Sequence, residues 1–234
     1  MLVEGVRGVA EALRTGSRAR FLLRSPRGDA LWTPELDGAV AGSRVEVLNV
    51  SDGEMGEVAG TETPQGVLLV AEEPKVHPET LWEAAAPRVL LLDGVQDPGN
   101  VGTLVRVAAA FACTGVVALD GTSDLWSARA VRAAAGTTFR LPVLHLGWAA
   151  VRDALESREI PLLTADAGGK DVRTVSERDR WVLAMGGEGA GCRGEVRERS
   201  QGVVSIPMPG GVESLNVGVA GAILLYELSR ELRA

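Results

Sequence analysis

Short apolar runs alternate with segments of helical periodicity over most of the chain. Apolar runs bounded by turn residues are typical of buried strands, and they lie at residues 89–92, 115–119, 160–163, 181–184 and 203–206. The segments with helical spacing lie near residues 100–111, 127–134, 148–157, 192–200 and 215–232. This alternation predicts a mainly parallel sheet that helices cover on both faces.

The first part of the chain mixes short strands and helices more densely. Apolar positions at near-helical spacing predict a helix over residues 3–13, which Gly16 can end. Ser51 and Glu54 have the spacing of a capping box and predict the start of a second, short helix. Strand-like runs lie at residues 20–24, 45–48 and 66–70. These elements together predict a compact α/β unit.

A polar segment separates the two patterns. Residues 72–78 combine charged side chains with two prolines, which is typical of a linker. We therefore predict a small α/β domain over residues 1–73, a linker over 74–87 and a larger α/β domain over 88–234. A chain of 234 residues is long enough for this division.

The net charge of −7 argues weakly against a nucleic-acid partner until the charges are located along the chain. Residues 1–30 hold six arginines and three acidic residues, so the basic character is confined to the start. A local arginine cluster can bind phosphate groups on an acidic protein, although a solvated surface explains the cluster equally well. The candidate phosphate ligands are Arg14, Arg18, Arg20 and Arg24.

The hydropathy of the chain and its cysteine and histidine residues indicate where the protein is located and whether it binds a metal ion. No apolar run reaches the length of a membrane span, and the start of the chain lacks the features of a signal peptide. Cys113 and Cys192 are far apart in sequence, which favours reduced thiols in the cytoplasm. Together with His77 and His145 they show no metal-ligand spacing. We therefore expect a cytoplasmic protein with neither a membrane anchor nor a metal site.

Two predicted strands are followed by loops rich in glycine or proline, whose backbone can approach a ligand closely. Residues 181–184 lead into the glycine-rich turn Met185–Gly191, and residues 203–206 are followed by Pro207 and Pro209. Ligands of open α/β sheets bind beside such carboxyl-terminal strand ends. Because glycine has no Cβ, its backbone can approach a ligand closely. The sequence therefore predicts a ligand site at this edge of the sheet.

A further candidate follows the strand at residues 89–92. Asp97-Pro-Gly99 predicts a turn, Asn100 the N-cap of the next helix, and Gly102 a close approach in its first turn. Arg106 lies six residues beyond Asn100 and can hold a phosphate or a ribose edge. Taken in isolation, a capped helix with a surface arginine is the simpler explanation of these residues.

Three segments together resemble the SpoU/TrmH family of RNA 2′-O-ribose methyltransferases. They are Asn100–Arg106, Met185–Gly191 and Ile206–Val217, and their order and spacing match that family. The resemblance extends to a segment between the first two motifs and to an N-terminal RNA-binding domain, at residues 129–143, 3–13 and 61–67. It thus covers nearly the whole chain.

The resemblance implies a parallel catalytic domain whose C-terminal part threads a trefoil knot, an exception among protein folds. It also implies a homodimer that binds S-adenosylmethionine in a bent conformation in the knot loops. By motif, the cofactor-binding residues are Thr164, Ala165, Met185, Gly186, Gly187, Gly189, Ile206, Pro207, Met208, Ser214, Leu215 and Asn216.

The resemblance assigns catalytic roles to Asn100, Arg106, Glu188, Ser214 and Asn216. In the family the arginine has been interpreted as the group that activates the ribose hydroxyl. Because an arginine keeps its proton in proteins, we favour a phosphate clamp that also stabilises the oxyanion. Asn100 and Glu188 would orient Arg106 or the nucleotide. The alternative for Glu188, Ser214 and Asn216 is a helix-capping role.

An α/β domain before the knotted domain resembles the ribosomal-RNA branch of the family, whereas the transfer-RNA branch typically lacks it. We therefore expect 23S ribosomal RNA as the substrate, with transfer RNA as the alternative. We also expect the arginine cluster to contact RNA phosphates.

Two other functions compete with this interpretation. Residues 189–194 match the Gly-x-Gly-x-x-Gly pattern of dinucleotide-dependent oxidoreductases, follow a strand and open a helix. A lone match of this kind explains neither Asn100 and Arg106 nor Ser214–Asn216. The second alternative is an RNA-binding module without catalysis, which is disfavoured because all the motif residues are present. Binding of S-adenosylmethionine or of NAD distinguishes these functions.

Overall fold

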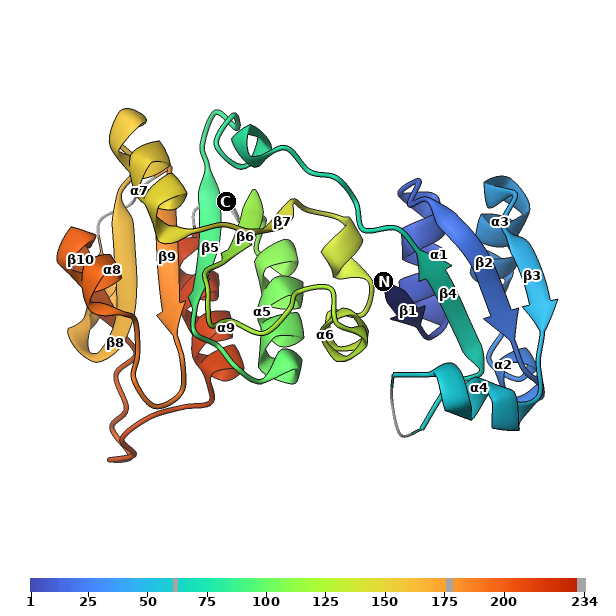
Figure 1. Ribbon diagram of the computed structural model, residues 1–234. Coiled ribbons are helices and arrows are strands. Elements are labelled where there is room, and N and C mark those ends of the chain that lie inside the picture. The colour runs from blue at the N-terminus through green and yellow to red at the C-terminus, as the bar shows by residue number, and fades with distance from the viewer. Residues whose placement is uncertain (61–62, 176–178, 231–234) are drawn as a thin grey trace.

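The described chain forms two β-sheets, which lie at opposite ends of an elongated molecule (Figure 1). The structure is a computed structural model that describes residues 1–60, 63–175 and 179–230. The strands of the first sheet are β1 (Leu2–Glu4), β2 (Ala19–Arg24), β3 (Glu46–Asn49) and β4 (Val67–Ala71). The strands of the second are β5 (Arg88–Asp93), β6 (Gly115–Ala118), β7 (Val143–His145), β8 (Leu162–Asp171), β9 (Trp181–Gly186) and β10 (Gly202–Ser205).

The first sheet has the order β1-β4-β2-β3, with β2 and β3 parallel and the other pairs antiparallel. Its helices are α1 (Val6–Arg14), α2 (Pro26–Asp29), α3 (Pro34–Ser43) and α4 (Asp52–Val58). The predicted helix over residues 3–13 is wrong in its first turn, because Val3 pairs with Leu69 in β1. Gly5, with φ of +90°, separates that strand from α1. The predicted capping box at Ser51 is confirmed. Residues 61–62, part of the family resemblance, lie outside the described residues.

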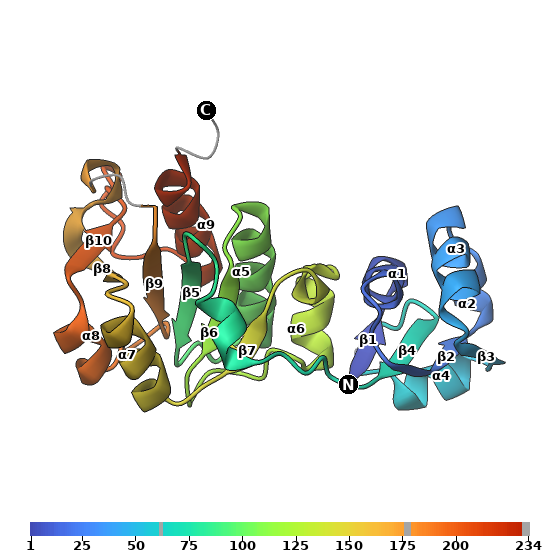
Figure 2. The ribbon, with the colours of Figure 1, turned by 90° about the horizontal axis from the view of Figure 1, so that it is seen from above.

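The second sheet has the order β10-β8-β9-β5-β6-β7, and all its strand pairs are parallel. Its helices are α5 (Pro98–Ala110), α6 (Ala128–Ala133), α7 (Trp148–Ser157), α8 (Gly194–Arg199) and α9 (Val217–Leu228). Helices α5, α6 and α9 cover one face, and α7 and α8 cover the other (Figure 2). The predicted parallel sheet with helices on both faces is therefore confirmed. Leu232, at the end of the predicted last helix, lies outside the described residues.

The central strand β5 is buried on both faces. Leu90 and Leu92 belong to the core that α5 and α9 cover, whereas Val89 and Leu91 belong to the core beneath α7 and α8. All four side chains are fully buried. Because β5 lies in the middle of the sheet, the residues that follow it are fixed at the carboxyl edge, where ligands of such sheets bind.

Two ion pairs join the sheets at the junction between α6 and the N-terminal helix. Arg132 lies 3.2 Å from the buried carboxylate of Glu4. Arg140 donates two hydrogen bonds, of 2.7 and 2.8 Å, to Glu11 of α1. The backbone between these arginines approaches α1 so closely that a Cβ on Gly136 would lie 3.2 Å from the carbonyl oxygen of Arg7. The two parts of the chain therefore meet over a specific, charged contact.

Candidate active site

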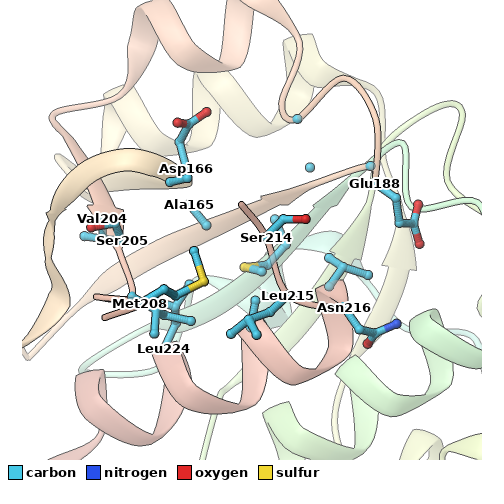
Figure 3. Close-up of a pocket in the computed structure, with 18 residues that line it drawn as sticks. Ala165, Asp166, Glu188, Val204, Ser205, Met208, Ser214, Leu215, Asn216 and Leu224 are labelled. Atoms are coloured by element: carbon cyan, nitrogen blue, oxygen red, sulfur yellow. The ribbon is translucent and has the colours of Figure 1, made fainter. Parts of the chain in front are cut away.

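A pocket of about 440 Å³ opens at the carboxyl ends of β9 and β10, beside the middle of β8 (Figure 3). Its volume lies within the range of small-molecule sites, roughly 300–1,000 Å³. Its lining is mainly apolar side chains and glycine backbone, with the polar groups of the segment before α9 at one side. The lining residues are Ala165, Asp166, Ala167, Met185, Gly186, Gly187, Glu188, Gly191, Val204, Ser205, Ile206, Met208, Ser214, Leu215, Asn216, Val217, Ala220 and Leu224.

One wall of the pocket comes from an interruption in the pairing of β8 with β10. Val203 pairs with Thr164, but the next residue, Val204, pairs with Lys170. The five residues 165–169 therefore form a bulge within β8, and the first three of them line the pocket. The bulge ends at Gly169, where a Cβ would lie 2.7 Å from the backbone carbon of Val204. A side chain at this position is incompatible with the close approach of the two strands.

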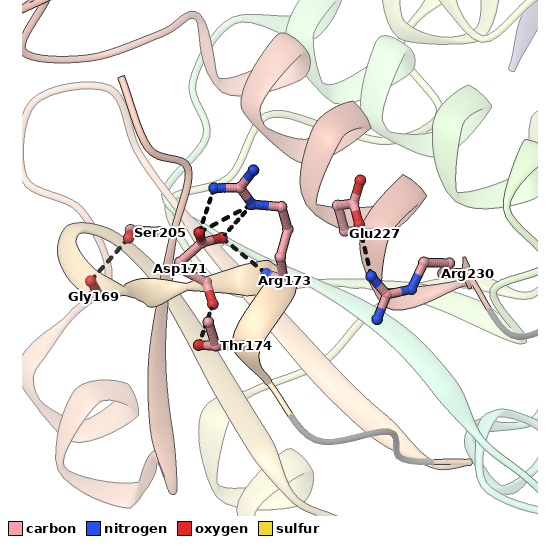
Figure 4. Close-up of polar contacts among 7 residues, drawn as sticks. All are labelled: Gly169, Asp171, Arg173, Thr174, Ser205, Glu227 and Arg230. Atoms are coloured by element: carbon pink, nitrogen blue, oxygen red, sulfur yellow. Dashed lines mark hydrogen bonds and ion pairs between the residues drawn. The ribbon is translucent and has the colours of Figure 1, made fainter. Parts of the chain in front are cut away.

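Polar contacts hold the carboxyl-terminal end of β8, after the bulge (Figure 4). The hydroxyl of Ser205 donates a hydrogen bond of 2.9 Å to the carbonyl oxygen of Gly169. Arg173 grips the carboxylate of Asp171, with Nη2 at 2.6 Å from Oδ2, and lowers the pKa of Asp171 below its usual value. Thr174 donates a hydrogen bond of 2.7 Å to the Asp171 carbonyl. The wall is therefore anchored at its far end by side chains and backbone together.

The glycine-rich turn forms a second wall because two of its residues have no space for a side chain. A Cβ on Gly186 would lie 2.0 Å from the carbonyl carbon of Gly191, and one on Gly187 would lie 2.3 Å from the oxygen of Gly94. The amide of Gly191 donates to the Gly187 carbonyl at 3.0 Å, which closes the turn into a small hairpin. We refer to residues 187–191 as the glycine loop. Its backbone groups line the pocket, as the pattern of glycines predicts.

Three polar side chains from distant segments meet at one edge of the pocket. The amide nitrogen of Asn100 donates to Glu188 Oε1 at 2.7 Å, and the amide nitrogen of Asn216 donates to Asn100 Oδ1 at 3.0 Å. Asn216 also caps α9, since its Oδ1 accepts hydrogen bonds from the amides of Gly218 and Val219. Figure 3 shows the polar ends of Glu188 and Asn216 on the same side of the pocket. We refer to Asn100, Glu188 and Asn216 as the polar triad.

The start of α5 differs from the prediction. Asp97, not Asn100, is the N-cap, and its carboxylate accepts the Asn100 amide at 2.9 Å. Pro98 follows at the first helical position, where its fixed φ and missing N–H are compatible with the helix. Asn100 therefore lies inside the first turn, and its side chain is available to Glu188. The predicted turn at residues 97–99 is this helix start.

Arg106 lies six residues beyond Asn100 on α5, about 9 Å along the helix axis. Its side chain is exposed, and within the described ranges it has no hydrogen bond or ion pair to another residue. A guanidinium in this position offers a planar set of donors to a phosphate or a ribose oxygen. The guanidinium therefore remains available on the helix that carries Asn100.

Most residues that the sequence assigns to a cofactor line the pocket, but Thr164, Gly189 and Pro207 do not. The hydroxyl of Thr164 bonds to Ser200 at 3.3 Å, and its side chain borders a separate, smaller cavity. Eight further residues line the pocket without having been predicted individually as site residues, which are Asp166, Ala167, Gly191, Val204, Ser205, Val217, Ala220 and Leu224. Ala220 and Leu224 lie four and eight residues after Asn216, so helical periodicity could have identified these two.

The glycine pattern at residues 189–194 and the neighbouring Cys192 have structural explanations. Burial raises the pKa of the Cys192 thiol to about 12, as expected of a structural thiol. In the Gly-x-Gly-x-x-Gly segment, the amide of Gly191 donates to Gly187 and the amide of Arg193 donates to Asp93. These N–H groups are already used within the protein, so they are not available to a dinucleotide pyrophosphate.

The arginines of the first domain are partly neutralised. Arg20 lies 2.7 Å and Arg18 3.9 Å from Glu72, so two cations share one carboxylate. Arg24 pairs with Asp29 at 2.5 Å and lies over the ring of Trp32. Arg14 donates a long hydrogen bond, of 3.5 Å, to a backbone carbonyl.

No group of three or more histidine, cysteine, aspartate or glutamate side chains is arranged to hold a metal ion among residues 1–60, 63–175 and 179–230. Within the same ranges, no helix combines the length and the apolar character needed to cross a membrane.

Comparisons with known proteins agree with this arrangement. The profile of the SpoU rRNA Methylase family matches residues 87–226, and that of the MRM3-like substrate binding domain matches residues 1–69. The chain is 33% identical to the 23S rRNA (guanosine(2553)-2′-O)-methyltransferase RlmP of Bacillus subtilis, over 97% of this chain and 87% of the relative. It is 37% identical to the 23S rRNA (guanosine-2′-O-)-methyltransferase RlmB of Xanthomonas campestris, over 80% and 78% of the two chains. The structure of the SpoU methyltransferase AviRb from Streptomyces viridochromogenes in complex with AdoMet superposes with a TM-score of 0.88 and 28% identity, covering 100% of this chain and 91% of that chain.

Proposed function

Because the chain belongs to the SpoU rRNA methylase family, we propose that it transfers a methyl group from S-adenosylmethionine to a ribose 2′-hydroxyl of 23S ribosomal RNA. Two curated relatives of similar length carry this activity in their names. The match of residues 1–69 to a substrate-binding domain supports ribosomal RNA over transfer RNA. We thus propose both the class of RNA and the ribose oxygen that accepts the methyl group.

The pocket residues fit S-adenosylmethionine. Ile206, Met208 and Leu215 supply an apolar surface for a nucleoside ring, and the glycine loop supplies backbone donors and acceptors. Thr164 precedes the lining residue Ala165, and its hydroxyl bonds to Ser200. When bound, S-adenosylmethionine supplies a methyl group on a positively charged sulfur. The pocket contains no arginine or lysine side chain among its described lining, which suits a cationic ligand.

The chain's own residues orient the RNA and exclude water. We assign Arg106 to the phosphate or ribose oxygen next to the reacting hydroxyl, because its donors are unused by other described residues. Asn100, Glu188 and Asn216 hold one another and fix the edge of the pocket where the ribose must lie. Ser214 lines the same pocket and is available to bond the incoming nucleotide. Alignment of the hydroxyl with the methyl group can supply much of the rate.

The single observation that carries the proposal is the polar triad at the rim of an apolar pocket, with Arg106 free on the same helix as Asn100. Mapping 2′-O-methyl positions in total RNA, from cells with and without this gene, tests it. We expect one position of 23S rRNA to lose its methyl group. An unchanged 23S map with a lost position in transfer RNA would overturn the proposed substrate.

We divide the chain into an RNA-binding domain over 1–73, a linker over 74–87 and a methyltransferase domain over 88–234. The wide spacing between the two sheets in Figure 1 supports this division. Arg14, Arg18, Arg20 and Arg24 would contact RNA phosphates, each arginine exchanging its present partner for a phosphate oxygen. We also place the protein in the cytoplasm, and we expect the C-terminal part to thread the trefoil knot of its family.

We propose further that the protein acts as a homodimer through α9. Val219, Ile223 and Tyr226 are 50%, 36% and 46% exposed, and their spacing of four and three residues gathers them on one face of the helix. An exposed apolar strip of this kind suits a two-fold contact. Sedimentation should show a species near twice 24.5 kDa, and Ile223→Glu should shift it to the monomer. A wild-type monomer with full activity would overturn this proposal.

A further inference from the structure

An ion pair joins the end of β5 to the residue that follows Cys192. The carboxylate of Asp93, in a residue only 3% exposed, accepts hydrogen bonds from the Arg193 backbone amide at 2.7 Å and from Arg193 Nε at 2.6 Å. Arg193 Nη2 donates to the carbonyl oxygen of Asp120 at 2.6 Å. We propose that Asp93 and Arg193 are a positioning pair that holds the glycine loop where the cofactor and Glu188 require it.

Asp93 and Arg193 together hold both ends of the glycine loop in place. The backbone oxygen of Asp93 accepts the amide of Gly187 at 3.0 Å, at the start of the loop. The side chain of the same residue holds Arg193, just after the end of the loop. One residue of the central strand therefore fixes both ends, and the hairpin bond between Gly187 and Gly191 completes the restraint.

The loop has few other restraints. Glu188, Gly189 and Ala190 are exposed, so side-chain packing does not hold the part of the loop that carries Glu188. Glycine-rich segments have many accessible backbone conformations, and ordering them is costly in entropy. The position of Glu188 beside Asn100 therefore depends on the two ends of the loop. Gly187, Glu188 and Gly191 also line the pocket, so a shift of the loop changes the pocket as well.

The chemistry of the pair suits this role. A buried carboxylate needs a partner, and the loss of that partner leaves an uncompensated charge. The planar guanidinium bonds Asp93 and Asp120 together, so it also links the loop to the segment after β6. Lysine retains the charge but cannot make both contacts with fixed geometry. Arg193→Lys should therefore restore the function only in part.

The test compares Arg193→Ala, Arg193→Lys and Arg158→Ala as the matched control. Arg158 is 35% exposed and pairs with Glu79 far from the pocket, while Arg193 is 32% exposed. Calorimetry measures the dissociation constant of S-adenosylmethionine, and methyl-transfer kinetics give kcat and the KM for RNA. For Arg193→Ala we expect affinity for S-adenosylmethionine to fall about tenfold and kcat to fall roughly ten- to a hundredfold, with an unchanged KM for RNA. Arg193→Lys should lie between that variant and wild type, and Arg158→Ala should match wild type.

A double-mutant cycle with Glu188→Gln separates positioning from general stability. If Arg193 acts through Glu188, the double variant should have nearly the kcat of the worse single variant, because both changes remove the same contact. Independent, multiplicative losses in kcat would overturn the inference, as would an unchanged dissociation constant in Arg193→Ala. This inference rests on the proposed function, whose failure is distinct: wild-type protein would then transfer no methyl group to RNA.

Discussion

Asn100 and Glu188, separated by 88 positions in sequence, are joined by a hydrogen bond of 2.7 Å at the edge of the pocket. The contact connects the first turn of α5 to the glycine loop. Asn216 extends it to the start of α9 through Asn100 Oδ1. Each side chain alone has a structural explanation, such as capping for Asn216. Their convergence beside an apolar pocket is what indicates a reaction site.

Arg106→Ala should lower methyl transfer by roughly 100-fold or more, because it removes the donors that we assign to the reacting nucleotide. The dissociation constant for S-adenosylmethionine should stay near that of wild type, since Arg106 does not line the pocket. Arg106→Lys should recover little, because lysine lacks the planar pair of donors. Arg152→Ala, on the exposed side of α7, is the matched control. If Arg106→Ala retained most of its turnover, the assignment of Arg106 would be wrong.

Ala220→Phe should weaken binding of S-adenosylmethionine roughly 10- to 100-fold by filling the pocket from α9. Ala149→Phe places the same side chain at an exposed site on α7, behind the sheet, and should bind like wild type. Calorimetry measures both dissociation constants. Equal affinities in the two variants would show that the cofactor binds elsewhere.

Replacing Arg18 and Arg20 with glutamate should weaken RNA binding and reduce its dependence on salt, by about one unit of slope for each lost phosphate contact. Glu72→Gln should have the opposite effect, because it releases both arginines from their shared carboxylate. Filter binding at several salt concentrations gives both slopes. A double variant with wild-type affinity and slope would mean that the cluster is only a solvated surface.

The contact between Glu11 and Arg140 should make the junction between the parts of the chain that carry the two sheets sensitive to acid. Hydrogen bonding by Arg140 lowers the pKa of Glu11 below its ordinary value of 4.5. The ionised pair therefore stabilises the folded protein above about pH 4.5, and this contribution is lost as the pH falls through the lowered pKa.

Urea unfolding of wild type and Glu11→Gln measures this effect. The difference in the free energy of unfolding should be present at pH 7 and should shrink as the pH falls below 4.5. A difference of equal size at pH 7 and at pH 3 would show that Glu11 acts by packing rather than by charge.

Much of the fold and part of the site follow from local patterns. The apolar run at β5 identifies a strand buried on both faces, and the glycines at 186 and 187 identify a close backbone approach. The family resemblance of the three motifs is also confirmed. The strand and the close approach are local features, because one periodicity or one residue type determines each of them.

Other features depend on contacts that a linear pattern does not contain. The bulge at residues 165–169 of β8 is evident only from the pairing of Val203 with Thr164 and of Val204 with Lys170. The sequence predicts the N-cap of α5 at Asn100 instead of Asp97, because both residues have capping side chains. Pro98 at the first helical position selects Asp97. The role of Arg193 likewise depends on Asp93, which lies 100 residues away.

The central claim is that a methyl group moves to a ribose oxygen of 23S ribosomal RNA. Its most direct test incubates the purified protein with tritiated S-adenosylmethionine and 23S rRNA that lacks the modification, followed by complete digestion and separation of nucleosides. We expect the label in a single kind of 2′-O-methylated nucleoside. Label on a nucleobase, or no transfer under conditions where S-adenosylmethionine binds, would contradict it.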